Sequence, residues 1–268
     1  MIDLEFIKSF FPENIRNNMI FSKMMLKEYL QLMILDFIST TKYAKDLVFI
    51  GDTNLRIIHG IDRFSEDLDF DCKNIAESEF MTMTNEVLEY LKRNGLNVVA
   101  KDSESNKLTA FRRSLYFPQL LFDLNLTGHK DERLLIKLEA QDQGIDYKIN
   151  VAYVNGCGFY FPQQVPSDSV LCSMKLSALL ARQKGRDFYD SMFLLSKTSP
   201  DYGFLGKRNG INSNEELISA ISNMLTSVNL NIKKRDFEHL LFDSRKSEKI
   251  LLFPNFIQQL KTAQPANG

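Results

Sequence analysis

Acidic side chains recur at every second position of one short stretch, at Asp67, Asp69 and Asp71. Alternate residues of a β-strand point to the same face, so these carboxylates would line one side while the apolar residues between them face the core. Like charges on one face repel, and burying them is costly unless a cation offsets them. Mg²⁺ prefers carboxylate oxygens and substrate phosphates. The spacing therefore predicts a Mg²⁺ site on Asp67 and Asp69, with a merely solvated acidic strand as the alternative.

The segment before this strand adds a phosphate-binding feature. Residues 47–50 (LVFI) predict a short buried strand that ends at Gly51, and a helix with Thr53 in its first turn follows. A glycine and a small hydroxyl residue at a helix start can present backbone N–H groups to a phosphate. A phosphate cradle beside a metal-binding carboxylate pair suits nucleotidyl transfer, in which a metal clamps the triphosphate and carboxylates activate the attacking hydroxyl.

The whole run from Gly51 to Asp71, GDTNLRIIHGIDRFSEDLDFD, resembles the first motif of the AbiEii/AbiGii family of toxin nucleotidyltransferases. That motif starts with Gly-Gly-Thr or Gly-Ser-Thr and continues to Arg-Phe-Ser-x-Asp-Leu-Asp-Phe. The resemblance implies two groups of site residues: a nucleotide-binding group and a pair that holds metal and takes part in catalysis. These are Gly51, Thr53, Arg63 and Ser65 for the nucleotide, and Asp67 and Asp69 for the metal.

One position departs from the family pattern. Asp52 stands where the family has Gly or Ser, and a carboxylate beside a triphosphate would repel it. Asp52 would then face away from the phosphates, pair with Arg56 or Arg63, or weaken the site. If it is inhibitory, we expect Asp52→Ser to raise activity.

Residues 175–190, KLSALLARQKGRDFYD, resemble a second block of the same family. Lys175 and Arg182 are seven residues apart and share a helix face, while leucines pack on the opposite side. The predicted phosphate-binding cations are Lys175, Arg182, Lys184 and Arg186, and the resemblance implies catalytic roles for Lys175 and Asp187. By charge alone, the block is also consistent with a surface ion-pair cluster that closes a helical hairpin.

A polymerase-beta-like site takes a third carboxylate from a neighbouring strand, and two candidates exist. Residues 134–140 place Lys137 and Glu139 on one strand face, and this stretch resembles the Lys-[Leu/Ile]-[Glu/Asp] strand of the family. Residues 120–126, also predicted as a strand, place Asp123 and Asn125 together. We favour Glu139 as a third metal ligand and catalytic residue, with Asp123 as the alternative.

The expected fold is α/β (α+β): a polymerase-beta-like mixed sheet flanked by helices, then a helical C-terminal part. Two domains are expected, a catalytic domain over residues 1–162 with an N-terminal helix, and a helical domain over residues 163–268 that completes the nucleotide site. Besides the segments above, the pattern predicts strands at 96–101, 109–117, 147–154 and 158–161, and helices at 13–41, 77–94, 168–183, 187–197, 214–227, 234–242, 245–252 and 255–262.

Composition excludes several other classes of protein. The chain has 268 residues, a net charge of -1, three cysteines without a CxxC pair and three scattered histidines, so a disulfide framework or a histidine- or cysteine-based metal site is not expected. No apolar run approaches the roughly 18 to 20 residues that span a bilayer, and the N-terminus does not resemble a signal peptide. We expect a cytoplasmic protein without membrane contact.

Together these features predict an enzyme that uses Mg²⁺ and an NTP, transfers a nucleotide to a hydroxyl acceptor and releases pyrophosphate. The resemblance implies the toxin of a toxin–antitoxin or phage-defence pair, with an antitoxin partner and an RNA acceptor such as a tRNA acceptor end. Two alternatives stay open: a catalytically weak or inactive nucleotide- or RNA-binding relative, and a nucleotidyltransferase that modifies a small-molecule alcohol.

Overall fold

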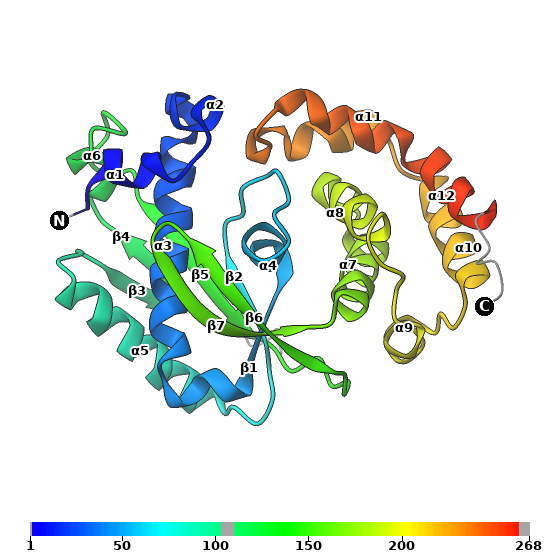
Figure 1. Ribbon diagram of the computed structural model, residues 1–268, viewed down its shortest axis with the longest axis horizontal. Coiled ribbons are helices and arrows are strands. Elements are labelled where there is room, and N and C mark those ends of the chain that lie inside the picture. Colours follow the sequence, from blue (N-terminus) through cyan, green and yellow to red (C-terminus); the bar gives the residue numbers. More distant parts are fainter. Residues whose placement is uncertain (1, 103–109, 263–268) are drawn as a thin grey trace. The chain divides into compact units, whose positions relative to one another are not determined.

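The computed structural model describes residues 2–102 and 110–262 (Figure 1). The chain divides into two compact units. The first unit contains residues 1–60, 64–144 and 149–165, and the second contains residues 61–63, 145–148 and 166–268. The expected domains 1–162 and 163–268 remain a prediction. The start of one predicted strand, at Thr109, and the C-terminal tail lie outside the described residues.

The first unit contains a mixed sheet with the strand order β1-β2-β5-β4-β3 in the described part of the chain. β2 and β5 are parallel, and the other neighbouring pairs are antiparallel. The strands are β1 (Leu47–Ile50), β2 (Leu68–Cys72), β3 (Val99–Asp102), β4 (Phe111–Phe117) and β5 (Leu134–Ala140). The predicted mixed sheet with flanking helices is therefore confirmed, and residues 47–50 and 134–140 form strands with the predicted bounds.

The two faces of this sheet differ in burial. Along β5, buried Leu134, Ile136, Leu138 and Ala140 alternate with the half-buried residues between them. The buried face is covered by helices α3 (Ser22–Ser39) and α5 (Glu77–Arg93), which contact β5 and β4 respectively and also contact each other. The opposite face, which carries Glu139, is more open, and this face is where charged side chains can meet a ligand.

The N-terminal helical region differs from the single helix predicted over residues 13–41. It consists of α1 (Leu4–Ser9), α2 (Glu13–Arg16), a 3₁₀ turn at Met19–Phe21, and then α3. The break occurs because Asn18 is extended and its side chain accepts the N–H of Ile20, which starts a new turn.

The predicted strand at residues 120–126 is wrong. The chain turns at Gln119, which adopts a left-handed conformation with φ 60°, and then forms the short helix α6 (Leu120–Asp123). Asp123 is exposed and lies outside the sheet. The alternation of apolar and polar residues was real but too short to distinguish a strand from one helical turn after a proline.

The rest of the first unit contains a 3₁₀ turn at Lys42–Asp46, helix α4 (Gly51–Ile57), and the two-stranded sheet of β6 (Ile149–Gly156) and β7 (Phe159–Pro166). α4 follows β1 directly, as predicted from the glycine at position 51. β2 begins at Leu68, so Asp67 is the residue that enters the strand.

The second unit is helical in its described residues. Its elements are α7 (Asp168–Arg182), α8 (Gly185–Leu195), α9 (Tyr202–Asn209), α10 (Asn214–Leu225), α11 (Leu230–Lys233), α12 (Phe253–Thr262) and 3₁₀ segments at Lys234–Asp236, Glu238–Leu240 and Ser244–Leu252. Helix α9, capped by the side chain of Asp201, was not predicted. The helices predicted at 234–242 and 245–252 are largely 3₁₀, so the segments are helical but more tightly wound.

No helix in the described residues combines the length and apolar character that a bilayer span needs.

Candidate active site

The turn between β1 and α4 requires a glycine for two reasons. Gly51 has φ +81°, a conformation that residues with a Cβ rarely adopt. A Cβ built at this position would lie 2.4 Å from Oδ2 of Asp69 and 2.9 Å from its Cβ. The Asp69 carboxylate therefore lies against the backbone of Gly51, which joins the two parts of the predicted motif.

We expect Gly51→Ala to lower the transfer rate by about 100-fold, because a displacement of roughly 1 Å in a catalytic group has effects of that size. The left-handed backbone adds a stability cost of about 1–3 kcal/mol. Gly60→Ala is the matched control, because Gly60 has φ +70° but no atom within 4 Å of an added Cβ. Thermal unfolding should show similar destabilisation in both variants, and the initial rate should fall only in Gly51→Ala. Equal rates in the two variants would contradict the close approach of Asp69 to Gly51.

Thr53 and Ser65 are buried, and their hydroxyl groups are hydrogen-bonded to each other. The Thr53 hydroxyl donates to Oγ of Ser65 at 2.7 Å and also contacts the carbonyl oxygen of Asp67. Thr53 is 0% exposed, and Asn54 beside it donates to the carbonyl of Phe49 at 2.7 Å. These contacts fix α4 to the residue that enters β2. The phosphate-binding roles of Thr53 and Ser65 remain predictions, and the structure gives both hydroxyls a role in holding Asp67.

The open face of the sheet brings Asp69 and Glu139 together. The two residues are register partners on the parallel strands β2 and β5, so their side chains point to the same side. Asp67, two residues before Asp69, belongs to this face as well. The third residue of the alternation differs: Asp71 is fully buried, and its Oδ1 accepts the N–H of Gln143 at 3.0 Å. Asp71 is thus a structural residue.

The environment of Asp67 disfavours its negative charge. Burial raises its pKa above the ordinary value, Lys137 and Lys27 oppose this shift, and the nearby carboxylates of Glu66 and Glu139 add to it. Nζ of Lys137 is 3.7 Å from Oδ2 of Asp67, a distance too long for a strong hydrogen bond. A cation placed between Asp67 and Asp69 would offset this cost.

Glu139 already has a cationic partner. Arg112 lies directly opposite on β4, with Nε 2.7 Å from Oε1 and Nη2 2.8 Å from Oε2. This hydrogen bond raises the pKa of Arg112. Asp69, Glu139 and Arg112 form one row across β2, β5 and β4. Sequence reasoning missed Arg112, because nothing in its local pattern shows which residue faces it on the next strand.

The residues present fit a divalent cation on Asp67 and Asp69. Both carboxylates are half-buried on one face, and the missing side chain of Gly51 leaves room for Asp69. Within the described ranges, no three acidic, histidine or cysteine side chains are grouped closely enough to form a ready-made metal cluster. Glu139, the third predicted ligand, is paired with Arg112.

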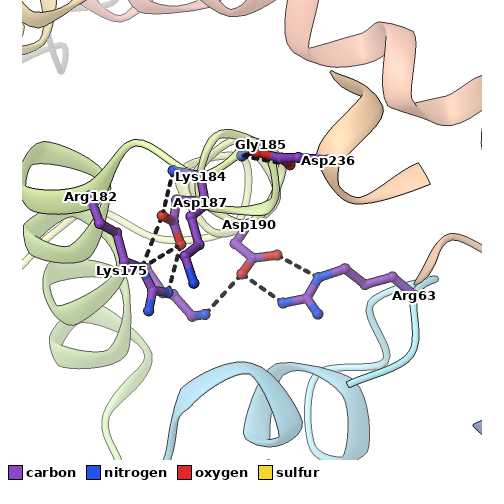
Figure 2. A network of polar contacts seen from close by, with 8 residues as sticks. All are labelled: Arg63, Lys175, Arg182, Lys184, Gly185, Asp187, Asp190 and Asp236. Carbon is purple, nitrogen blue, oxygen red and sulfur yellow. Dashed lines mark hydrogen bonds and ion pairs between the residues drawn. The ribbon is translucent and has the colours of Figure 1, made fainter. Parts of the chain in front are cut away.

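The second unit contains a buried ion-pair network on α7, α8 and the segment 61–63 (Figure 2). Asp190 accepts hydrogen bonds from Nε and Nη2 of Arg63 at 2.8 and 2.7 Å, and from Nζ of Lys175 at 2.8 Å. Arg63 and Asp190 are 0% exposed and Lys175 is 4% exposed. Arg63 thus has a structural role in this network, and its predicted contact with the nucleotide is not tested by these bonds.

Asp187 makes different contacts from those of Asp190. Its carboxylate accepts a hydrogen bond from Nη2 of Arg182 at 2.7 Å and one from the backbone N–H of Lys184 at 3.0 Å, which caps α8 (Figure 2). The structure therefore links Lys175 to Asp190, and the catalytic role that the resemblance implies for Asp187 remains a prediction. Lys175 and Asp190 both belong to the second family-like block. Their pairing could not be predicted from the sequence, because it depends on how α7 packs on α8.

The start of α8 is also held by a neighbouring segment. Both carboxylate oxygens of Asp236 accept the N–H of Gly185 at 3.0 Å, and a Cβ on Gly185 would lie 1.9 Å from the carbonyl oxygen of Lys233. Gly185 thus allows close packing of residues 233–236. The predicted cations Lys184 and Arg186 flank it, and their binding of phosphate stays a prediction.

Two solved structures share the fold at low sequence identity. MenT4, a nucleotidyltransferase toxin from Mycobacterium tuberculosis, matches with a TM-score of 0.64 and 14% identity over 99% of this chain and 91% of its own. JHP933 from Helicobacter pylori matches with a TM-score of 0.54 and 19% identity over 89% of this chain and 92% of its own. No curated protein matches the chain.

A family model covers most of the sequence. The model for the nucleotidyl transferase AbiEii toxin of type IV toxin–antitoxin systems matches residues 34–265, a range that includes both predicted motifs. The predicted resemblance is thereby confirmed. The chain belongs to the AbiEii family of nucleotidyltransferase toxins.

Proposed function

We propose that this toxin transfers a nucleotide from an NTP to a hydroxyl group of RNA, such as a tRNA acceptor end, with the help of Mg²⁺. The observation that carries the proposal is the register pairing of Asp69 with Glu139, together with Asp67, on the open face of the sheet. Two or three carboxylates on one face, next to a glycine turn, supply the ligands that nucleotidyl transfer requires.

In this proposal Asp67 and Asp69 hold Mg²⁺, and Glu139 completes the set. The ion, when bound, would polarise the α-phosphoryl group and stabilise the charge on the leaving group. The acceptor oxygen forms a bond to the α-phosphorus, the bond to the β-phosphate oxygen breaks, and pyrophosphate leaves. One of the carboxylates takes the proton of the acceptor hydroxyl. Lys175, Arg182, Lys184 and Arg186 keep their predicted role in neutralising the triphosphate.

The family also implies an antitoxin partner. We propose that this partner acts with the toxin in the cytoplasm, in keeping with the absence of an apolar helix of spanning length in the described residues.

Asp52 favours a second candidate, a catalytically weak relative. It lies in the first turn of α4 and is 8% exposed. If its charge repels the triphosphate, Asp52→Ser will increase the rate and tighten nucleotide binding. An equal or lower rate in that variant would count against this candidate.

The decisive experiment uses the purified chain with Mg²⁺ and each of the four NTPs labelled at the α-phosphate. Three acceptors are offered separately: total cellular RNA, total cellular protein, and a mixture of aminoglycoside-type alcohols. We expect label in RNA with one preferred NTP and no label after addition of EDTA. Label only in protein or only in the alcohols would overturn the RNA proposal and identify the other class of acceptor.

A further inference from the structure

The open face of the sheet that carries Asp67, Asp69 and Glu139, called the carboxylate face, also contains Arg112, a cation whose position the proposed chemistry does not explain. Nη2 of Arg112 donates a hydrogen bond to Oε2 of Glu139 at 2.8 Å, and Nε lies 2.7 Å from Oε1 in an ion pair without a hydrogen bond. A charge-assisted hydrogen bond of this kind is roughly twice as strong as one between neutral groups. The positive charge of Arg112 beside Glu139 opposes the binding of a second cation at the same oxygens.

We propose that Arg112 is a positioning residue that withholds Glu139 from the metal until the nucleotide's phosphates bind Arg112. This inference rests on the proposed function, since it presumes a metal on Asp67 and Asp69. It adds an order to the assembly of the site: the nucleotide releases Glu139, and the third carboxylate then joins the other two.

The strand register supports this competition. Glu139 on β5 lies between Asp69 on β2 and Arg112 on β4, and each neighbour is its direct register partner. A small rotation of the Glu139 side chain would thus move its carboxylate from Arg112 to a position beside Asp69. Lys137 on β5 is 3.7 Å from Oδ2 of Asp67 and competes less strongly with a metal ion on that carboxylate.

Exposure allows a ligand to reach this ion pair. The side chains of Arg112 and Glu139 are 30% and 23% exposed. The next residue, Arg113, shows the contrast: it points to the covered face, is 7% exposed, and donates to Thr84 Oγ1 and the carbonyl of Met81. Only Arg112 of these two arginines can exchange a carboxylate for an anionic phosphate from solvent.

The consequence is a thermodynamic coupling between nucleotide and metal. A nucleotide that engages Arg112 frees Glu139 and so raises the affinity for metal, and by linkage the metal raises the affinity for nucleotide. Removal of the arginine should abolish the coupling by making Glu139 available at all times.

The test measures Mn²⁺ binding to the purified full-length chain by electron paramagnetic resonance of the free ion. We compare the wild type, Arg112→Gln, Arg112→Lys, and Arg112→Gln combined with Glu139→Gln. Arg93→Gln is the control, because it removes one positive charge from an exposed position on α5. Each protein is measured alone and with a mixture of four non-reactive α,β-methylene NTPs, after subtraction of the Mn²⁺ that the nucleotides bind themselves.

Without nucleotide, we expect Arg112→Gln to bind Mn²⁺ about tenfold more tightly than the wild type, the size of effect of one strong charged pair. The gain in Mn²⁺ affinity should disappear in the double variant. The affinity of Arg112→Lys should lie between those of the wild type and Arg112→Gln. Nucleotide should tighten Mn²⁺ binding in the wild type much more than in Arg112→Gln.

Mn²⁺ binding by Arg112→Gln that is equal to or weaker than that of Arg93→Gln would overturn the inference, and a purely structural role of Arg112 predicts weaker binding. Failure of the proposed function has a different signature: the wild type then binds no Mn²⁺ even with nucleotide, which overturns both proposals.

Discussion

Asp69→Asn is expected to reduce the rate of nucleotidyl transfer by about 1,000-fold or more. The variant loses several kcal/mol of transition-state stabilisation, and each factor of ten in rate corresponds to about 1.4 kcal/mol. The variant keeps the size and shape of the side chain and removes only its charge. Asp69 and Glu139 are like charges on neighbouring strands, so the loss of one charge should leave the folded state at least as stable.

The measurement is the initial rate of α-phosphate label transfer, together with the thermal unfolding midpoint. Asp123→Asn is the matched control, because Asp123 is exposed on α6 and was the alternative third carboxylate. We expect wild-type activity in this control. A large loss in Asp123→Asn, or a rate within tenfold of the wild type in Asp69→Asn, would contradict the assignment of the carboxylate face.

Of the substitutions proposed here, Asp190→Asn is expected to lower the free energy of unfolding the most. It removes the negative charge that two cations share, and Arg63 and Lys175 are 0% and 4% exposed. A buried charge without its partner costs about 3–5 kcal/mol. For a chain of this size, such a loss lowers the unfolding midpoint by about 6 °C or more.

The control for this prediction is Asp243→Asn in the same unit. Asp243 pairs with Arg245, whose side chain is 88% exposed, and exposed pairs of this kind contribute little. We expect the unfolding midpoint of this control to equal that of the wild type. If Asp190→Asn were as stable as Asp243→Asn, the network in Figure 2 would not be the stabilising element that its burial indicates.

Much of the sheet could be predicted because its signals are local. A short apolar run, a glycine and strict alternation located β1, the start of α4, β2 and β5, and the pairing of Asp69 with Glu139 follows from putting those strands side by side. The same rule failed at residues 120–126, where the left-handed Gln119 turns the chain into α6. In so short a segment, alternation cannot be separated from one helical turn.

The partners of the charged residues could not be predicted, because they come from distant parts of the chain. Arg112 meets Glu139 only through the β4–β5 register, and Asp190 meets Arg63 across 127 residues of the sequence. The resemblance implies a catalytic role for Asp187, which stays a prediction, and the structure shows that its carboxylate caps α8 and binds Arg182. Sequence patterns therefore identified the right blocks, and packing decided which carboxylate holds which cation.

In the proposed reaction, the carboxylate face transfers the nucleotide with its α-phosphoryl group from an NTP to RNA. The most direct measurement incubates wild-type protein and Asp69→Asn with cellular RNA and Mg²⁺, using NTPs labelled either at the α- or at the γ-phosphate. We predict α-label in RNA and γ-label in released pyrophosphate with the wild type, and neither with Asp69→Asn. Transfer of γ-label to RNA, or equal α-label transfer by both proteins, would contradict the account.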